Sequence, residues 1–234
     1  MELLRKLVTE VVGTMFLAAA IGFAVTQNVE LAALTIGFAL MVVVYAGGAI
    51  SGAHYNPAVT LALWVRGACK GSEVLPYIVA QLIGAALGWL IVFVSFGQGF
   101  GPQMGAQVPP MQGIWLEAVF TFLLVFTILN VAASKRTAGN SYFGLAIGMA
   151  VFVGATIIGP VTGGALNPAI GLSPNLMNML FGQGELGDVW VYLIGPTLGA
   201  AVAAFVFNFL NPDDRMIEGE SVLESDRVAT VPNE

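Results

Sequence analysis

Gly52-Ala53-His54-Tyr55-Asn56-Pro57-Ala58-Val59 is the stretch that decides the fold, and Gly164-Ala165-Leu166-Asn167-Pro168-Ala169-Ile170 repeats its pattern in the second half of the chain. In each stretch an Asn directly precedes a Pro. Asn is a favoured N-cap, and Pro fits the first helical position because the N–H that it lacks would be unpaired there. Each stretch therefore predicts a helix that begins at its Pro.

The first of these helices is too short to cross a membrane. From Pro57 to about Val65 it has about ten residues and is roughly 15 Å long. The hydrocarbon core of a bilayer is roughly 30 Å thick. The sequence thus predicts two half-helices, one in each half of the chain.

The composition is that of an integral membrane protein. Hydrophobic residues make up 57% of the chain and charged residues only 9%, whereas soluble domains carry about 25% charged residues. The chain has 29 glycines, and glycines spaced four apart favour close packing of helices in lipid. Such pairs occur at Gly84/Gly88, Gly144/Gly148 and Gly195/Gly199.

Apolar runs predict six membrane-spanning helices, near residues 7–26, 31–49, 75–96, 114–133, 141–159 and 188–209. The half-helices fall after the second and fifth spans, so the order span, span, half-helix, span occurs twice. Near the start of the last span, Trp190 and Tyr192 are expected as anchors at the membrane interface. The predicted fold is an all-α membrane protein with six transmembrane helices and two half-helices in an inverted repeat.

The chain is divided accordingly. Residues 1–210 are predicted to form a single transmembrane domain with inverted halves at about 1–100 and 113–210. Residues 211–234 hold seven acidic and two basic residues, which predicts an acidic, disordered cytoplasmic tail. The net charge of −6 comes mainly from this tail.

The basic residues indicate the orientation, because Lys and Arg collect in cytoplasmic loops. With six spans and both termini cytoplasmic, all eight basic residues lie on the cytoplasmic side. None occurs in the opposite connections near 27–30, 97–113 and 160–187. We therefore expect a multi-pass protein of the cell membrane with two cytoplasmic termini.

Half-helices that enter from opposite faces are typical of inverted-repeat channels and transporters. Backbone that is not helical at mid-membrane is tolerated where it lines a cavity. The residues before each Asn are therefore expected to present carbonyl groups to a water-filled path; they are Gly52, Ala53, His54, Gly163 and Ala165.

Paired Asn-Pro-Ala motifs, the fuller string from Ser51 to Val59 and the order of spans resemble the aquaporin and glycerol-facilitator family of channels. The likeness covers about residues 5–210. It implies a passive, single-file pore in each subunit of a homotetramer in the lipid bilayer. The motif residues are Asn56, Pro57, Ala58, Asn167, Pro168 and Ala169.

An Asn that caps its own helix through its side-chain oxygen leaves its amide NH₂ facing outward as a donor. Asn56 and Asn167 are expected to meet at mid-membrane and to offer these donors to a passing oxygen atom. The positive ends of both half-helices would point there too and oppose protons and cations.

The selectivity filter departs from the family pattern. The resemblance places it at Ile36, Ala155, Gly164 and Ile170, and the family normally has an Arg where this chain has Ile170. Loss of an Arg removes five donors and a fixed positive charge. A wider, apolar filter is expected to pass water and larger neutral solutes such as glycerol, urea, ammonia or neutral metalloid hydroxides.

Glu10 and Glu117 occur near the starts of spans one and four. The resemblance implies that they brace the two loops by accepting backbone N–H bonds. The alternative is a proton relay or a coupling-ion site in a secondary transporter, since those proteins also use inverted repeats.

Other functions find little support. Asn56 and Asn167 could be plain helix caps that never meet a solute. An enzyme is not expected, because one His and one Cys leave no set of nucleophile and base. His54 is expected to contribute its carbonyl to the pore and its ring to the structure. No metal, cofactor or nucleic-acid partner is predicted.

Overall fold

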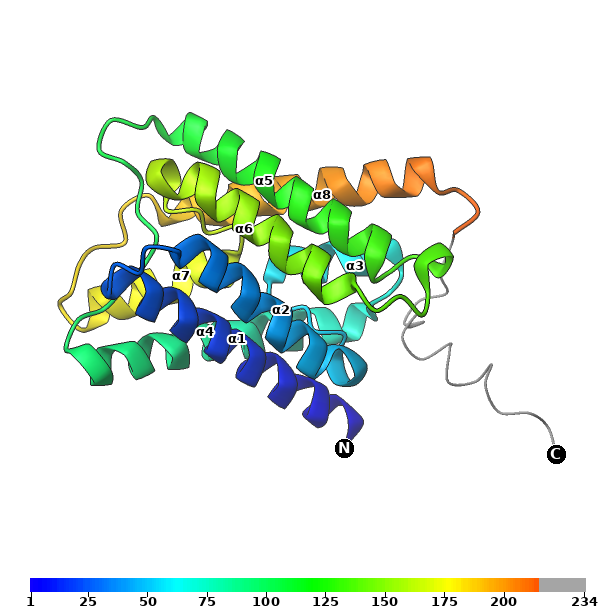
Figure 1. The fold of residues 1–234 in the computed structure, drawn as a ribbon, viewed down its shortest axis with the longest axis horizontal. Helices are drawn as coiled ribbons and strands as arrows, with labels where there is room; N and C mark the ends of the chain where they lie inside the picture. Colours follow the sequence, from blue (N-terminus) through cyan, green and yellow to red (C-terminus); the bar gives the residue numbers. More distant parts are fainter. Residues whose placement is uncertain (215–234) are drawn as a thin grey trace.

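The computed structural model describes residues 1–214, and within this part all regular structure is helical (Figure 1). Six helices there are long and apolar enough to span a membrane, and two short helices lie between them. The prediction of an all-α membrane fold is confirmed. The helices are α1 (Glu2–Thr26), α2 (Ala32–Ser51), α3 (Pro57–Arg66), α4 (Gly71–Phe96), α5 (Pro110–Val131), α6 (Phe143–Thr162), α7 (Pro168–Leu180) and α8 (Val189–Leu210), with a 3₁₀ turn η1 (Lys135–Thr137) before α6.

The short helices begin where the sequence predicts. Asn56 caps α3 by accepting a hydrogen bond from the backbone N–H of Ala58 at 2.9 Å, and Asn167 caps α7 through Ala169 at 2.9 Å. The two helices are 10 and 13 residues long. They lie toward opposite ends of the long axis of the bundle (Figure 1).

The two halves of the chain repeat one set of packing relations and also interlock. Helix α1 packs on α4 as α5 packs on α8, and α2 of the first half meets α6 of the second. Each half-helix packs against the last long helix of the other half, α3 on α8 and α7 on α4. Neither half-helix can therefore be positioned by its own repeat alone.

Glycine allows the long helices to approach closely. A Cβ atom on Gly84 or Gly88 of α4 would lie 2.5 Å from a carbonyl oxygen of α1. On α8, a Cβ on Gly195 would lie 2.9 Å from the carbonyl oxygen of Ile114 in α5, and Gly199 has still less room. These glycine pairs let backbone meet backbone, as expected for helices that pack in lipid.

The ends of α3 and α8 are joined by a buried ion pair. Nη2 of Arg66 lies 3.0 Å from Oδ1 of Asp214, and both side chains are 2% exposed. The guanidinium also lies 5.0 Å from the centre of the Phe207 ring. Asp214 accepts a hydrogen bond from the Ser134 hydroxyl at 2.6 Å and one from the Lys135 backbone N–H at 3.2 Å.

This ion pair includes a residue from the start of the predicted tail. Asp214 belongs to the packed structure, where the buried Arg66 neutralises its carboxylate. That the acidic tail is disordered stays a prediction. Residues 215–234 lie outside the described part of the chain.

We expect that replacing Asp214 destabilises the protein. The D214A variant removes the carboxylate from a buried guanidinium, which typically costs about 3–5 kcal/mol of the free energy of unfolding. Denaturant titration of the purified protein in detergent measures this loss. The neighbouring D213A variant is the matched control, because Asp213 is exposed.

A double variant, Arg66→Met with Asp214→Leu, should recover most of the stability, because a buried ion pair is often replaced by apolar side chains at little cost. Equal stability of D214A and D213A would contradict a structural role for the ion pair.

Candidate functional site

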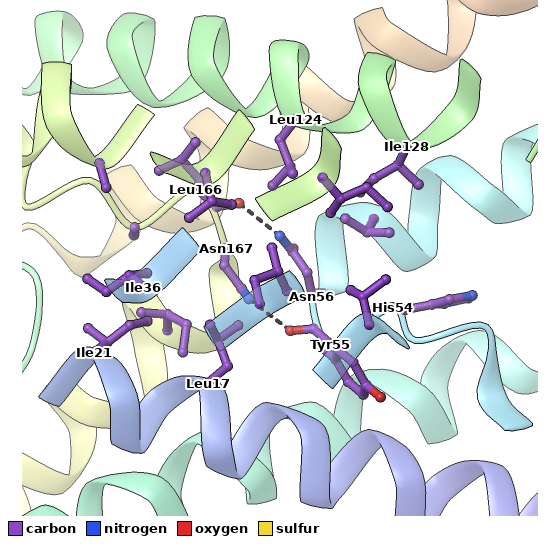
Figure 2. A pocket seen from close by; sticks show the side chains of 18 of the residues that line it. Leu17, Ile21, Ile36, His54, Tyr55, Asn56, Leu124, Ile128, Leu166 and Asn167 are labelled. Carbon is purple, nitrogen blue, oxygen red and sulfur yellow. Dashed lines mark hydrogen bonds between the residues drawn. The ribbon is translucent and has the colours of Figure 1, made fainter. Parts of the chain in front are cut away.

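The two half-helices meet through their capping asparagines near the centre of the bundle (Figure 2). Nδ2 of Asn56 donates a hydrogen bond to the carbonyl oxygen of Leu166 at 2.9 Å, and Nδ2 of Asn167 donates one to the carbonyl oxygen of Tyr55 at 2.8 Å. Each Asn thus caps its own helix with its oxygen and ties the opposite loop with its nitrogen.

These contacts correct the expectation that the whole amide NH₂ faces a solute. An amide nitrogen carries two N–H groups, and one from each Asn is used to join the loops. One N–H on each side chain is left for the cavity, which both Asn56 and Asn167 line.

The residues before each Asn adopt a backbone conformation that is uncommon for L-residues. Tyr55 has φ 51° and Leu166 has φ 49°, in the left-handed region that few residues other than glycine occupy. The carbonyl oxygens of these two residues accept the hydrogen bonds from the asparagine side chains. Because this backbone conformation is strained, the surroundings must hold it in place.

Glu10 holds the first loop. Its Oε1 atom accepts hydrogen bonds from the Ser51 hydroxyl at 2.7 Å and from the His54 backbone N–H at 3.0 Å. Its Oε2 atom accepts from the Tyr55 backbone N–H at 2.7 Å and from Nε2 of Gln81 at 2.8 Å. The carboxylate is fully buried, and its oxygens are occupied by donors of the end of α2, of the loop and of α4.

Glu117 makes the equivalent contacts with the second loop. It accepts hydrogen bonds from the Thr162 hydroxyl at 2.7 Å, the Ala165 N–H at 3.0 Å and the Leu166 N–H at 2.7 Å. Among the residues that the structure describes as lining the central cavity, neither Glu10 nor Glu117 is present. This is the geometry of a brace behind the pore wall.

Two tyrosines complete the support. The Tyr77 hydroxyl donates to the carbonyl oxygen of Ser51 at 2.8 Å, and the Tyr192 hydroxyl donates to that of Thr162 at 2.7 Å. Tyr192 is almost fully buried, so its predicted place at the membrane interface is wrong. Its hydroxyl pairs with the buried carbonyl oxygen of the last residue of α6, a contact that the sequence pattern does not reveal.

The His54 ring lies behind its loop rather than at the centre of the cavity. Nδ1 lies 3.1 Å from the Thr60 hydroxyl oxygen, and the ring centre lies 4.8 Å from that of Tyr77. Within residues 1–214, no three His, Cys, Asp or Glu side chains are close enough together to hold a metal ion.

A cavity of about 330 Å³ runs past the paired asparagines. Both sets of predicted backbone positions line it: Gly52, Ala53 and His54 from the first loop, and Gly163 and Ala165 from the second. The four positions predicted to form the filter, Ile36, Ala155, Gly164 and Ile170, line the same cavity. A Cβ on Gly164 would lie 3.5 Å from Cα of Ala155, so these two small residues are adjacent.

The sequence motifs do not point to the rest of the cavity wall. Leu17 and Ile21 of α1 and Leu124 and Ile128 of α5 line the cavity (Figure 2). A signal existed, because these residues follow Glu10 and Glu117 at spacings of seven and eleven, which places them along one helix face. The α4–α5 loop also contributes Phe100, Gly101, Pro102 and Gln103, and no motif marks this segment.

The cavity has an uncharged lining. No Asp, Glu, Lys or Arg is found among the described residues that line it. The N-termini of α3 and α7 meet there, and each carries a partial positive charge that disfavours cations. Carbonyl groups and two amide N–H groups are left to replace the hydrogen bonds that a solute loses on leaving water.

Comparison with known proteins agrees with this geometry. Residues 1–207 match the model of the family described as Major intrinsic protein. The chain is 36% identical over 218 residues to aquaporin NIP1-1 of Zea mays, covering 88% of this chain and 75% of that protein. It is 43% identical over 187 residues to the probable aquaporin AqpM of Archaeoglobus fulgidus, covering 76% of each.

A solved structure shows the same fold. The aquaglyceroporin of Plasmodium falciparum superposes with a TM-score of 0.77 at 24% identity, covering 90% of this chain and 98% of that one. At this identity the likeness speaks for the fold alone.

We expect that the E10Q and E117Q variants weaken both the fold and permeation. Whichever way the new amide turns, its nitrogen faces one loop N–H that loses its acceptor. A buried donor without a partner costs about 1–3 kcal/mol. Denaturant titration and osmotic swelling of proteoliposomes measure the two effects, and water permeability should fall in both variants.

The matched control is E185Q, since Glu185 is exposed in the loop before α8. If E10Q and E117Q behaved like E185Q in both measurements, the two carboxylates would not brace the loops.

Proposed function

The chain belongs to the major intrinsic protein family, and from this premise we propose that it is a passive channel for water and for larger neutral solutes. The family is one of membrane channels and not of enzymes. The finer proposal is that an apolar filter without Arg admits solutes such as glycerol, urea, ammonia or neutral metalloid hydroxides.

The filter carries this proposal. Ile36 and Ile170 are apolar, and Ala155 and Gly164 are small, so these four positions bring neither a fixed charge nor an aromatic ring to this part of the cavity. Ile170 is nearly buried and packs in one apolar cluster with Ala169 and Phe100. The carbon atoms of a solute such as glycerol contact this apolar wall more favourably than they contact the charged side chain of a filter that contains Arg.

Exclusion of ions would depend on the centre of the pore. With no Arg in the filter, the positive ends of α3 and α7 are the main electrostatic barrier to cations. An ion would also have to shed its water beside apolar side chains without a compensating charge.

The rival function is secondary transport coupled through Glu10 and Glu117. Both carboxylates are occupied by loop donors and lie outside the cavity lining. Uptake that is linear in solute concentration and independent of a proton gradient supports the channel. Saturable, gradient-dependent uptake supports the transporter.

We further propose that both termini are cytoplasmic and that the protein is a homotetramer in the cell membrane. The start of α1 and the end of α8 lie at one end of the bundle (Figure 1). The basic residues of the described part cluster there, with Lys6 contacting Glu73 and Arg66 contacting Asp214. Large apolar side chains, such as Phe205 and Phe209, are exposed on the long helices and suit contact with lipid or with neighbouring subunits.

We expect proteoliposomes that contain the protein to take up glycerol and urea as well as water. The I170R variant should take up less glycerol relative to water, because it adds bulk and a fixed charge to the filter. The A155F variant should narrow the same site without any charge. I170L is the control that keeps size and polarity. Passage of water with full exclusion of glycerol and urea by the unmodified protein would contradict the proposal.

A further inference from the structure

The α4–α5 loop, residues 97–109, is fixed against the half-helix that carries the filter. Nδ2 of Asn175 donates to the carbonyl oxygen of Pro102 at 3.0 Å, and Nδ2 of Asn178 donates to that of Phe100 at 3.1 Å. Both asparagines are on α7 and are buried. Asn178 is itself oriented by Nε1 of Trp89, which donates to its Oδ1 at 2.7 Å.

The loop lies too close to its supports to move as a flexible lid. A Cβ on Gly101 would lie 2.5 Å from Oδ1 of Asn175, and Gly99 has even less room beside Asn178. A Cβ on Gly163 would lie 2.7 Å from the backbone nitrogen of Gln103. The loop therefore packs directly on the residue that precedes the filter position Gly164.

Phe100 brings an aromatic ring to the filter. It is 5% exposed, lines the cavity and belongs to the apolar cluster of Ile170 and Ala169. A Cβ on Gly22 of α1 would lie 2.5 Å from its ring. The ring is thus held between α1 and α7, beside the side chain that occupies the family's Arg position.

Gln103 is a polar residue at the same end of the cavity, where its backbone nitrogen lies next to Gly163. Of the described residues that line the cavity, five have polar side chains: His54, Tyr55, Asn56, Gln103 and Asn167. Four of these belong to the two Asn-Pro-Ala stretches. Gln103 is the one that comes from the α4–α5 loop, and it is exposed. Its amide can both donate and accept hydrogen bonds.

We propose that Phe100 and Gln103 determine solute selection at the filter, with the Phe100 ring as its rigid apolar wall and the Gln103 amide as its hydrogen-bonding group. This inference deepens the proposed function and rests on it. A neutral solute leaving water would meet Gln103 as a partner where the four filter positions offer apolar or small side chains. A Gln amide holds no net charge, so it can hydrogen-bond a neutral solute without adding a fixed charge to the filter.

The test compares Q103L with Q107L in proteoliposomes of the full chain. Gln107 is exposed in the same loop and is not among the residues that line the cavity. Loss of one neutral hydrogen bond lowers a rate about two- to tenfold. We expect glycerol uptake relative to water to fall by this factor in Q103L and to stay unchanged in Q107L. In F100L, uptake of a longer polyol such as xylitol should rise at least twofold.

A second variant guards against an uninformative change in loop structure. Q103R adds a cation at an exposed position and should reduce glycerol and urea uptake at least as strongly as Q103L. Elution volume and thermal unfolding in detergent should match the unmodified protein for all variants.

The outcomes separate the two proposals. If glycerol passes the unmodified protein while Q103L, Q103R and F100L all behave like Q107L, the role of the loop is overturned and the proposed function stands. If only water passes the unmodified protein, the proposed wider solute range is overturned, and the variants are then compared by their water permeability. A lower water permeability of Q103L than of Q107L supports the role of the loop, and equal water permeability of the two variants overturns that role.

Discussion

The structure depends on one constraint, which is that backbone outside helices must find hydrogen-bond partners where no bulk water reaches it. Two loops here leave their helices within the bundle and expose successive N–H groups. Glu10 and Glu117 accept these N–H groups from behind, and each takes two from consecutive residues. The carbonyl groups of the same loops are thereby left to face the other half or the cavity. A neutral side chain with one acceptor atom could not do this, because two backbone donors point at separate oxygens.

The hydrogen bonds between the two halves of the chain join two short, individually unstable half-helices, α3 and α7, into one rigid junction. A helix of about ten residues is marginal by itself, and the strained residues Tyr55 and Leu166 add to its cost. Each asparagine amide, however, binds the strained carbonyl of the opposite loop. Each half-helix also packs on the last long helix of the other half. The junction forms only when both halves are folded, so its stability is shared between them.

The sequence predicts those parts of this structure that local rules decide. Asn followed by Pro marks the start of both half-helices, and apolar runs of about twenty residues mark the spans. Roles that depend on tertiary contacts could not be predicted from the sequence. Tyr192 resembles an interface residue until its hydroxyl is seen to serve Thr162, and Asp214 resembles part of a solvated tail until it meets Arg66. No sequence motif marks Phe100 and Gln103. Their loop is held at the cavity by hydrogen bonds from two asparagines of α7, which are more than 70 residues away in the sequence.

The junction and the filter differ in how freely they can vary. At the junction, the side-chain oxygen and nitrogen of both Asn56 and Asn167 are hydrogen-bonded to the backbone, so a change there removes structure. At the filter, the side chain of Ile170 contacts an apolar cluster and the cavity, and within the described structure no hydrogen bond depends on it. An apolar residue at this position is therefore compatible with the fold. In our proposal the neighbouring loop supplies the polar contact that Ile170 lacks, because Ile170 and Gln103 line the same cavity from different elements.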